Sequence, residues 1–273
     1  MSQFDSLDEF VVRNRNGNAL KLIPYIGCKA GFHDIFDEII PDDLNGQIYD
    51  VFGGGGSFSF YACQRFGSHR VCYNDNNPVL VNLIRCLQTD PTGLWEIYNE
   101  HYLCSSTEHY YEVRTANIGE GVRGAGNFLY LAKNAFSGKI RFNAQGRFNS
   151  PIRKGSSCPR LELDSLVALS SIIAEMTLTN QDYTEFSSLR DALIYLDPPY
   201  FNNTNGHYNS VLDLAVFNGF LRDIEQVNKV ILSEQNPPEI FELPTAYTVH
   251  RVTLKRSLQY VTQRQSQEII ALN

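Results

Sequence analysis

The chain has little of what marks a metal centre, a disulfide framework or a membrane protein. Its six cysteines are scattered and never form a C-x-x-C pair, which argues against a zinc site and against structural disulfides. No stretch approaches the roughly 18 consecutive apolar residues of a transmembrane helix. Residues 1–5 lack a basic segment followed by an apolar one, so no signal peptide is expected. These absences predict a cytoplasmic protein with reduced thiols, no metal and no membrane partner.

Acidic residues are missing from one long segment, although the whole chain is acidic. The 273 residues carry 23 Lys and Arg against 30 Asp and Glu, a formal net charge of −7. Residues 121–161 contain no Asp or Glu but eight Lys and Arg. A local basic stripe on an acidic body is typical of a surface that binds phosphate. We therefore expect this segment to face a nucleic acid; the alternative is a solvated basic face.

One short apolar run, residues 192–196, leads directly into Asp197-Pro198-Pro199-Tyr200. The run is typical of a buried strand, which the two prolines end. A carboxylate and an aromatic ring are thereby placed at the carboxyl end of a strand, where open α/β sheets bind ligands. An ionised Asp only accepts hydrogen bonds and a Tyr ring stacks on planar heterocycles, so the pair suits an aromatic amine such as adenine. The alternative is a proline-terminated strand with a capping Asp.

A glycine-rich turn, residues 53–57, follows a predicted strand over 47–52. A helix over 58–66 and a strand over 70–73 are expected next. Asp75 stands about twenty residues beyond the glycines, where nucleotide-binding α/β folds place the acid that holds a ribose hydroxyl. This order favours a nucleoside cofactor. The alternative is a glycine turn needed only for steric reasons.

The remaining pattern predicts an α/β sheet domain interrupted by an insertion. Further helices are expected over residues 32–40, 79–87, 161–177 and 211–227, and further strands over 229–233 and 267–272. Within residues 88–160, the segment 134–151 combines aromatic, amide and basic residues with turn glycines, which suits contacts with nucleic acid; the alternative is a small domain that merely carries a hairpin. The predicted division is a loosely attached lead-in of residues 1–20, a sheet domain of 21–87 and 161–273, and a smaller inserted domain of 88–160.

Motifs follow one another in a fixed order from about Ile23 to the end of the chain. They are Tyr25-Ile26-Gly27-Cys28-Lys29, similar to an aromatic-x-G-x-K cofactor motif; residues 50–57, similar to an acid-P-F-x-G-x-G-S loop; Asn74-Asp75-Asn76-Asn77-Pro78, similar to an N-D-x-N-P segment; and residues 142–151, similar to a Y-N-x-x-G-x-F-N-x-P hairpin. With D-P-P-Y last, the chain resembles the Dam-type (D12 class) DNA adenine-N6 methyltransferases of the alpha group. Cys28 and Val51 depart from the family pattern at positions that shape the backbone.

This resemblance implies a fold, a reaction and a set of site residues. The fold is a Rossmann-like S-adenosylmethionine-dependent methyltransferase sheet with an inserted, mostly helical target-recognition domain that carries a β-hairpin. The reaction is methyl transfer from S-adenosylmethionine, leaving S-adenosylhomocysteine, to N6 of an adenine flipped out of double-stranded DNA, with a GATC-like site as the first expectation. The implied cofactor-binding residues are Tyr25, Lys29, Phe52, Gly54, Gly56, Ser57, Asp75, Asp182, Tyr183 and Asp197. The implied catalytic residues are Asp197, Pro198 and Tyr200, and the implied DNA-binding residues are Lys133, Lys139, Arg141, Asn143, Arg147, Asn149 and Arg153.

The resemblance also implies roles for individual side chains. Lys29 is expected to meet the cofactor carboxylate and Asp75 the ribose hydroxyls. Asp197 and the Pro198 carbonyl would accept hydrogen bonds from N6, while Tyr200 stacks the flipped base. In-line transfer then needs mainly positioning, without a metal or a covalent enzyme intermediate. The alternatives are methylation of RNA adenine or cytosine N4, and a catalytically silent DNA- or cofactor-binding protein; a nicotinamide dehydrogenase is disfavoured because no catalytic His or Lys stands at a suitable place.

Overall fold

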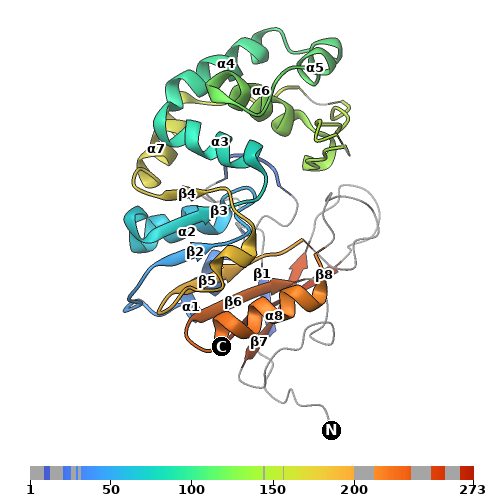
Figure 1. Cartoon of the computed structure of the whole chain (residues 1–273). Helices are drawn as coiled ribbons and strands as arrows, with labels where there is room; N and C mark the ends of the chain where they lie inside the picture. The colour runs from blue at the N-terminus through green and yellow to red at the C-terminus, as the bar shows by residue number, and fades with distance from the viewer. Residues whose placement is uncertain are drawn as a thin grey trace.

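The protein is described by a computed structural model that covers residues 9–12, 21–25, 29, 32–143, 145–155, 157–199, 212–234, 247–255 and 265–273. Within these residues the chain forms one eight-stranded sheet, ordered β1-β7-β8-β6-β5-β2-β3-β4, with helices on both faces and a helical part above it (Figure 1). No helix in the described part of the chain is long and apolar enough to cross a membrane.

Most strand pairs of the sheet are parallel. The strands are β1 Glu9–Val12, β2 Ile48–Asp50, β3 Val71–Asn74, β4 Thr177–Thr179, β5 Leu193–Leu196, β6 Lys229–Glu234, β7 Thr248–Lys255 and β8 Gln265–Leu272. Only β8 runs against its neighbours, and it lies between β6 and β7. β2 pairs in parallel with both β3 and β5, so the strand order reverses there. Open α/β sheets bind ligands at such a switch point, beyond the carboxyl ends of the strands.

Both faces of the sheet are buried, and β5 shows why its sequence is a continuous apolar run. Leu193 and Tyr195 belong to the core that contains α1 (His33–Ile39) and α2 (Ser57–Phe66). The alternate residues Ile194 and Leu196 pack in the core of the opposite face, with α8 (Leu214–Glu225). Because successive strand residues point to opposite faces, a strand covered on both sides is apolar throughout.

The helical part consists of α3 (Pro78–Thr89), α4 (Pro91–Leu103), α5 (Thr107–Val113), α6 (Gly121–Asn134) and α7 (Leu163–Ile172). Asn77 and Asp90 cap α3 and α4 by accepting hydrogen bonds from backbone N–H groups, each next to a proline in the first turn. α6 packs closely on α4, since a Cβ on Gly126 would lie 2.3 Å from the Ile97 side chain. The apolar core is continuous from the sheet into these helices. The predicted domain boundaries at 87/88 and 160/161 stay predictions.

The structure corrects three expectations about secondary structure. Residues 1–20 are more than a loosely attached lead-in, because β1 pairs in parallel with β7 at one edge of the sheet. The helix expected over 161–177 spans only Leu163–Ile172, and Thr177–Thr179 pairs with β3 as β4. β7 was not predicted at all, although it pairs along its whole length with β8. The other predicted helices and strands are confirmed to within a few residues.

Candidate active site

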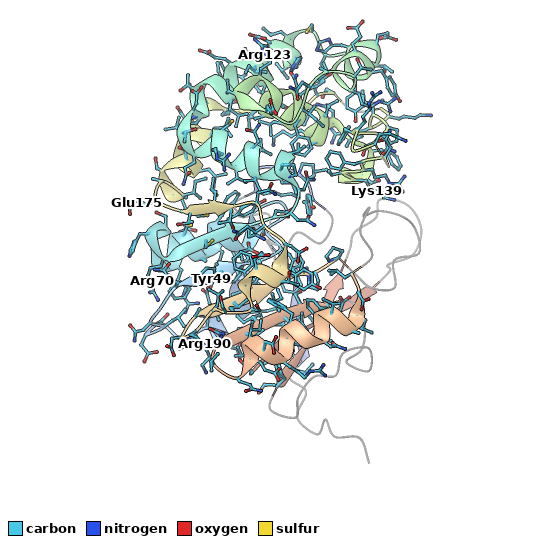
Figure 2. The ribbon with its side chains drawn as sticks, viewed as in Figure 1. Tyr49, Arg70, Arg123, Lys139, Glu175 and Arg190 are labelled. Atoms are coloured by element: carbon cyan, nitrogen blue, oxygen red, sulfur yellow. The ribbon has the colours of Figure 1, made fainter. Side chains whose placement is uncertain are left out.

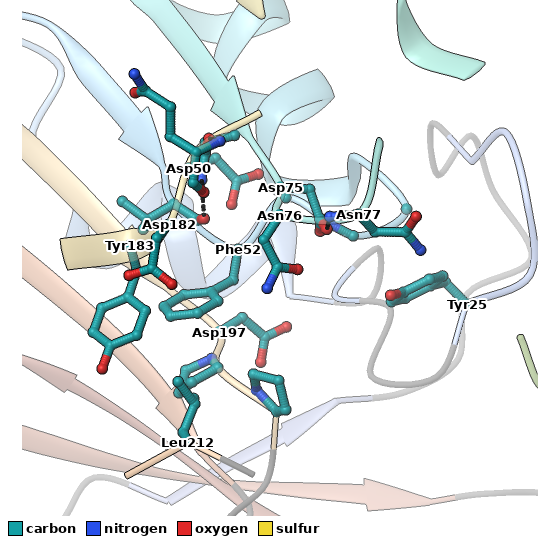
Figure 3. Close-up of a pocket in the computed structure, with 18 of the residues that line it drawn as sticks. Tyr25, Asp50, Phe52, Asp75, Asn76, Asn77, Asp182, Tyr183, Asp197 and Leu212 are labelled. Atoms are coloured by element: carbon teal, nitrogen blue, oxygen red, sulfur yellow. Dashed lines mark hydrogen bonds between the residues drawn. The ribbon is translucent and has the colours of Figure 1, made fainter. Parts of the chain in front are cut away.

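A pocket of about 690 Å³ lies at the switch point, beyond the carboxyl ends of β2, β3 and β5 (Figure 3). This volume falls within the range usual for ligand pockets, roughly 300–1,000 Å³. The wall contains the glycine turn, the segment after β3 and the first residues after β5. The motifs that the sequence predicts to act together therefore do meet in one cavity.

The glycine turn can follow its course only because it lacks side chains. Gly54 and Gly56 have φ values of 50° and 78°, in the left-handed region that glycine tolerates best. A Cβ at Gly53 would lie 2.2 Å from the Tyr73 ring, and one at Gly54 would lie 2.9 Å from the Tyr25 ring. Tyr25 thus packs on the turn and lines the pocket, and its contact with the cofactor stays a prediction. Gly56 shapes the backbone and is not part of the pocket wall.

Asp75 links the glycine turn to the start of α3. Its Oδ2 accepts a hydrogen bond from Gly54 N at 2.8 Å and its Oδ1 accepts one from Asn77 N at 2.8 Å. Burial raises the pKa of this carboxyl to about 6, although the two backbone bonds lower it. Asp75 lies in the pocket wall where the sequence predicts a ribose acceptor.

Asp50, the last residue of β2, is a pocket residue that the sequence interpretation left without a role. It is 1% exposed, and its Oδ2 accepts hydrogen bonds from Ser59 N at 3.2 Å and Ser59 Oγ at 2.6 Å. Its Oδ1 has no hydrogen-bond partner among the described residues. Burial raises the pKa of Asp50 to about 7. Its position as the acid of the quoted 50–57 motif was the signal that could have singled it out.

Lys29 and Asp197 form an ion pair inside the pocket. Lys29 Nζ donates to both carboxylate oxygens of Asp197 at 2.8 Å, and the side chains are 2% and 21% exposed. The sequence predicts both residues for the site but assigns Lys29 to the cofactor carboxylate. The structure brings Lys29 to the D-P-P-Y carboxylate instead, across 168 positions of sequence.

An aromatic group forms another side of the pocket. The rings of Phe52 and Tyr183 lie 5.6 Å apart, and the Phe217 ring of α8 lies 5.8 Å from Tyr183. Asp182 caps the short helix η3 (Tyr183–Phe186), accepting a hydrogen bond from Thr184 N at 3.0 Å. Figure 3 shows Phe52, Asp182 and Tyr183 on one side of the cavity, with Asp197 nearby. Ser57 and Pro198 also line the pocket, whereas Tyr200 lies outside the described residues.

The predicted hairpin is present in the part of the chain after α6, and it reaches the pocket. Phe142 and Phe148 form an antiparallel bridge, and Asn143 N donates to Arg147 O at 2.8 Å. The Asn143 side-chain oxygen accepts hydrogen bonds from the backbone N–H groups of Gln145 and Arg147, which holds the turn. Ile140, Phe142 and Gly146 line the same cavity as Asp197. This shared wall was not predicted.

The predicted DNA-binding residues divide into two groups. The first group lies on the hairpin, where two residues are exposed, Arg147 and Asn149, and three are half-buried, Lys139, Arg141 and Asn143. Figure 2 places Lys139 at the lower edge of the helical part. Lys133 and Arg153 lie half-buried at the base, where Arg153 N donates to Asn134 O at 2.8 Å. Burial, together with the neighbouring charge of Lys21, lowers the pKa of Lys133 to about 8.

In the folded chain, two basic residues of the segment 121–161 form ion pairs with acidic residues from outside that segment. Arg123, at the far end of the helical part in Figure 2, pairs with Glu100 of α4. Arg160 pairs with Glu162 at 2.9 Å. These two cations are therefore partly neutralised by residues outside 121–161, and the positive charge that remains is concentrated near the hairpin.

Comparison with known proteins decides the family. The model of the D12 class of N6 adenine-specific DNA methyltransferases matches residues 25–258. The chain belongs to this family. It is 25% identical to the type II methyltransferase M.MjaIII of Methanocaldococcus jannaschii over 196 residues, 65% of this chain and 68% of that protein. It is 24% identical to the DNA adenine methylase of Haemophilus influenzae over 275 residues, 93% of this chain and 94% of that protein.

Membership of the D12 class confirms the enzyme class and the Rossmann-like methyltransferase fold predicted from the motifs. A D12-class enzyme needs a methyl donor and acts on adenine in DNA. Of the predicted cofactor set, all members except Gly56 line the pocket. The structure adds Asp50 and Asn76 to that wall, and Figure 3 shows both side chains at the cavity.

Proposed function

We propose that this D12-class enzyme transfers a methyl group from S-adenosylmethionine to N6 of an adenine flipped out of double-stranded DNA. The observation that carries the proposal is the single pocket in which the glycine turn, Asp75 and Asp197 meet. Bound S-adenosylmethionine would supply an electrophilic methyl group on a positively charged sulfur. The reaction also requires a site for a planar base next to it, and the pocket is large enough for ligands of this class.

The charges in the pocket wall suit a cationic cofactor. Among the described residues of the wall, one is basic, Lys29, and five are acidic: Asp50, Asp75, Asp182, Asp197 and Asp213. A concave surface lined by one sign of charge attracts ligands of the opposite sign. The buried Asp50 Oδ1 has no hydrogen-bond partner among the residues that the structure describes, and this is the clearest indication that a ligand supplies a donor there. Asp75 would hold the ribose, and the Phe52–Tyr183 side would pack on the adenine ring.

Asp197 would bind the amino group that is methylated. Lys29 donates to both of its oxygens, which favours the ionised carboxylate even though other acids are near. An ionised carboxylate only accepts hydrogen bonds, so it can orient the two N6 hydrogens and aim the nitrogen lone pair. The Pro198 carbonyl would be the second acceptor and Tyr200 the stacking ring. The proton on N6 can leave after methyl transfer, so Asp197 need not act as a general base.

The hairpin would hold the DNA. Lys139, Arg141, Arg147 and Arg153 are suited to phosphate contacts, Lys133 would join them at the base, and Asn143 and Asn149 carry amides that can reach base edges. The flipped base enters the pocket beside the hairpin residues that line it. We propose a GATC-like target site, as in Dam-type enzymes, and an intracellular location, where the DNA is.

Transfer of a tritiated methyl group tests this function directly. The wild-type enzyme should label duplex DNA, and nucleoside analysis should give N6-methyladenine. Label in RNA or in N4-methylcytosine would show that the methyl acceptor is RNA or cytosine and not adenine in DNA. Intact DNA binding without any label would show that the protein is catalytically silent. Asp197→Ala should keep DNA binding and lose methylation; substantial residual turnover would refute the role of Asp197.

A further inference from the structure

Asn74, the last residue of β3, joins three segments of the chain with one side chain. It is 1% exposed and belongs to the pocket wall. Its Nδ2 donates to Val51 O at 2.9 Å and to Gln181 O at 3.0 Å. Its Oδ1 accepts hydrogen bonds from Gln181 N at 2.9 Å and from Thr179 Oγ1 at 2.8 Å. A side-chain amide has two donors and one oxygen with two lone pairs, so the protein itself uses the whole hydrogen-bonding capacity of Asn74.

The partners of the Asn74 amide fix its orientation. Val51 O and Gln181 O can only accept a hydrogen bond, and Gln181 N can only donate one, so Nδ2 must face the two carbonyls. Asn74 and Thr179 are paired in the ladder between β3 and β4, and the amide continues this pairing to Gln181, beyond the end of β4. Loss of the NH2 group would leave two carbonyls at the pocket edge without this donor, which is costly at a buried site.

The two segments that the amide ties together carry the aromatic side of the pocket. Phe52 follows Val51 directly, and Tyr183 stands two residues after Gln181. The Phe52 and Tyr183 rings lie 5.6 Å apart, and both are seen at the cavity in Figure 3. One NH2 group therefore bridges the backbone next to one ring and the backbone close to the other. The separation of the two rings depends on that bridge.

We propose that Asn74 is a positioning residue that sets the aromatic side of the pocket for the methyl donor. This role rests on the proposed function, because it requires the adenine ring of S-adenosylmethionine on the Phe52–Tyr183 side. Asn74 has no hydrogen-bonding capacity left for a ligand, so it acts through the two rings. The rings would hold the cofactor equally well before and during methyl transfer. Misplacing them therefore weakens cofactor binding and raises KM, while kcat stays close to its wild-type value.

Asn74→Asp tests this role, because it keeps the size of the side chain and turns an oxygen towards the two carbonyls. The KM for S-adenosylmethionine should rise by roughly tenfold or more, with kcat near the wild-type value. Calorimetry should show S-adenosylhomocysteine and 5′-methylthioadenosine losing affinity by the same factor, because both carry adenosine. A lower kcat at unchanged KM, as a smaller folded fraction would give, overturns the proposal. A greater loss for S-adenosylhomocysteine also overturns it, because the effect would then lie at the amino-acid end.

Asn228→Asp is the matched control. The Asn228 side chain is also buried, and its Nδ2 donates to Leu189 O at 2.9 Å and to Ile224 O at 2.8 Å. Its Oδ1 accepts a hydrogen bond from Ala192 N at 3.1 Å, at the amino end of β5 and therefore away from the pocket. The same chemical change there should lower thermal stability and leave the KM for S-adenosylmethionine unchanged. An equal rise of KM in this variant would overturn the specific role of Asn74.

A double-mutant cycle shows whether Asn74 acts through the rings. In a Tyr183→Leu background, Asn74→Asp should weaken S-adenosylhomocysteine binding by much less than in the wild-type background, and additive losses would refute the proposal. If Asn74→Asp does not fold, Thr179→Val decides, because it removes the hydroxyl that donates to Asn74 Oδ1 and keeps the size of the side chain. Its KM for S-adenosylmethionine should rise by a smaller factor; an unchanged KM would overturn the proposal. Wild-type enzyme that does not bind S-adenosylhomocysteine would overturn the proposed function instead.

Discussion

Replacing Lys29 with methionine removes the cation that both carboxylate oxygens of Asp197 contact at 2.8 Å. Methionine keeps most of the aliphatic length, so the change isolates the charge. Lys29 is 2% exposed and Asp197 21%, so the pair is largely but not fully shielded from water. Breaking a buried ion pair by removing one partner costs roughly 3–5 kcal/mol. Because Asp197 retains some contact with solvent, we expect a loss near the lower end, about 3 kcal/mol, in the free energy of unfolding.

The same substitution should change how activity depends on pH. Asp197 would then lie near the acid Asp50 without the bonded cation, so its protonation becomes easier and less of it is ionised at neutral pH. The acid limb of the kcat–pH profile should therefore move to higher pH, with part of the lost activity recovered in alkaline solution. Lys229→Met, at an exposed position at the start of β6, is the matched control and should leave both measurements unchanged. An unshifted acid limb in Lys29→Met, together with wild-type stability, would refute the inference that Lys29 maintains the charge of Asp197.

Three other perturbations have defined outcomes. Gly56→Ala should lower the free energy of unfolding by about 1–3 kcal/mol, because φ is 78° and the new Cβ would lie 2.6 Å from the Phe60 ring. Gly219→Ala is the control: a Cβ there would meet no described heavy atom within 4 Å outside its own helix backbone, so the same thermal melt should show no destabilisation. Replacing the three hairpin cations Lys139, Arg141 and Arg147 with alanine should reduce the slope of log K for DNA binding against log salt concentration by about 3, at roughly 0.9 per phosphate contact. An unchanged slope would show that these three residues do not contact phosphate. Asp50→Asn should raise the free energy of unfolding at pH 8, because a carboxyl whose pKa is higher in the folded than in the unfolded state destabilises the fold when it is ionised. Urea titrations at the two pH values should show a smaller increase in this free energy at pH 5 than at pH 8.

The parts of the fold and site that the sequence predicts are those built from neighbouring residues. The glycine turn and Asp75 lie within one strand–turn–helix–strand unit, so residue type and spacing alone indicate their meeting. The continuous apolar run of residues 193–196 likewise predicts the buried strand β5, which Asp197 follows directly. Local pattern suffices in these places because the contacts are made within a few tens of residues.

What the sequence did not predict depends on contacts between distant segments. The Lys29–Asp197 pair joins residues 168 positions apart, and only the folded sheet brings them together. β1 exists as a strand because β7 offers it a hydrogen-bonding edge, not because residues 9–12 alternate strongly. The Asp50–Ser59 contact is a different case, because it is local and spans only nine positions: both hydrogen bonds of Ser59 go to Oδ2, and Oδ1 has no hydrogen-bond partner among the described residues. Spacing along the chain does not reveal which oxygen of a carboxylate is satisfied.

The hairpin wall of the pocket has a thermodynamic consequence. Ile140, Phe142 and Gly146 belong to the segment that would hold DNA, yet they enclose the same cavity as Asp50 and Asp197. If DNA displaces the hairpin, the contacts between the hairpin residues and a ligand in the cavity change, and so does the affinity for that ligand. Linkage makes such an effect reciprocal: the factor by which DNA alters affinity in the cavity equals the factor by which the cavity ligand alters affinity for DNA. In this architecture, DNA and the ligand of the cavity would therefore be effectors of each other.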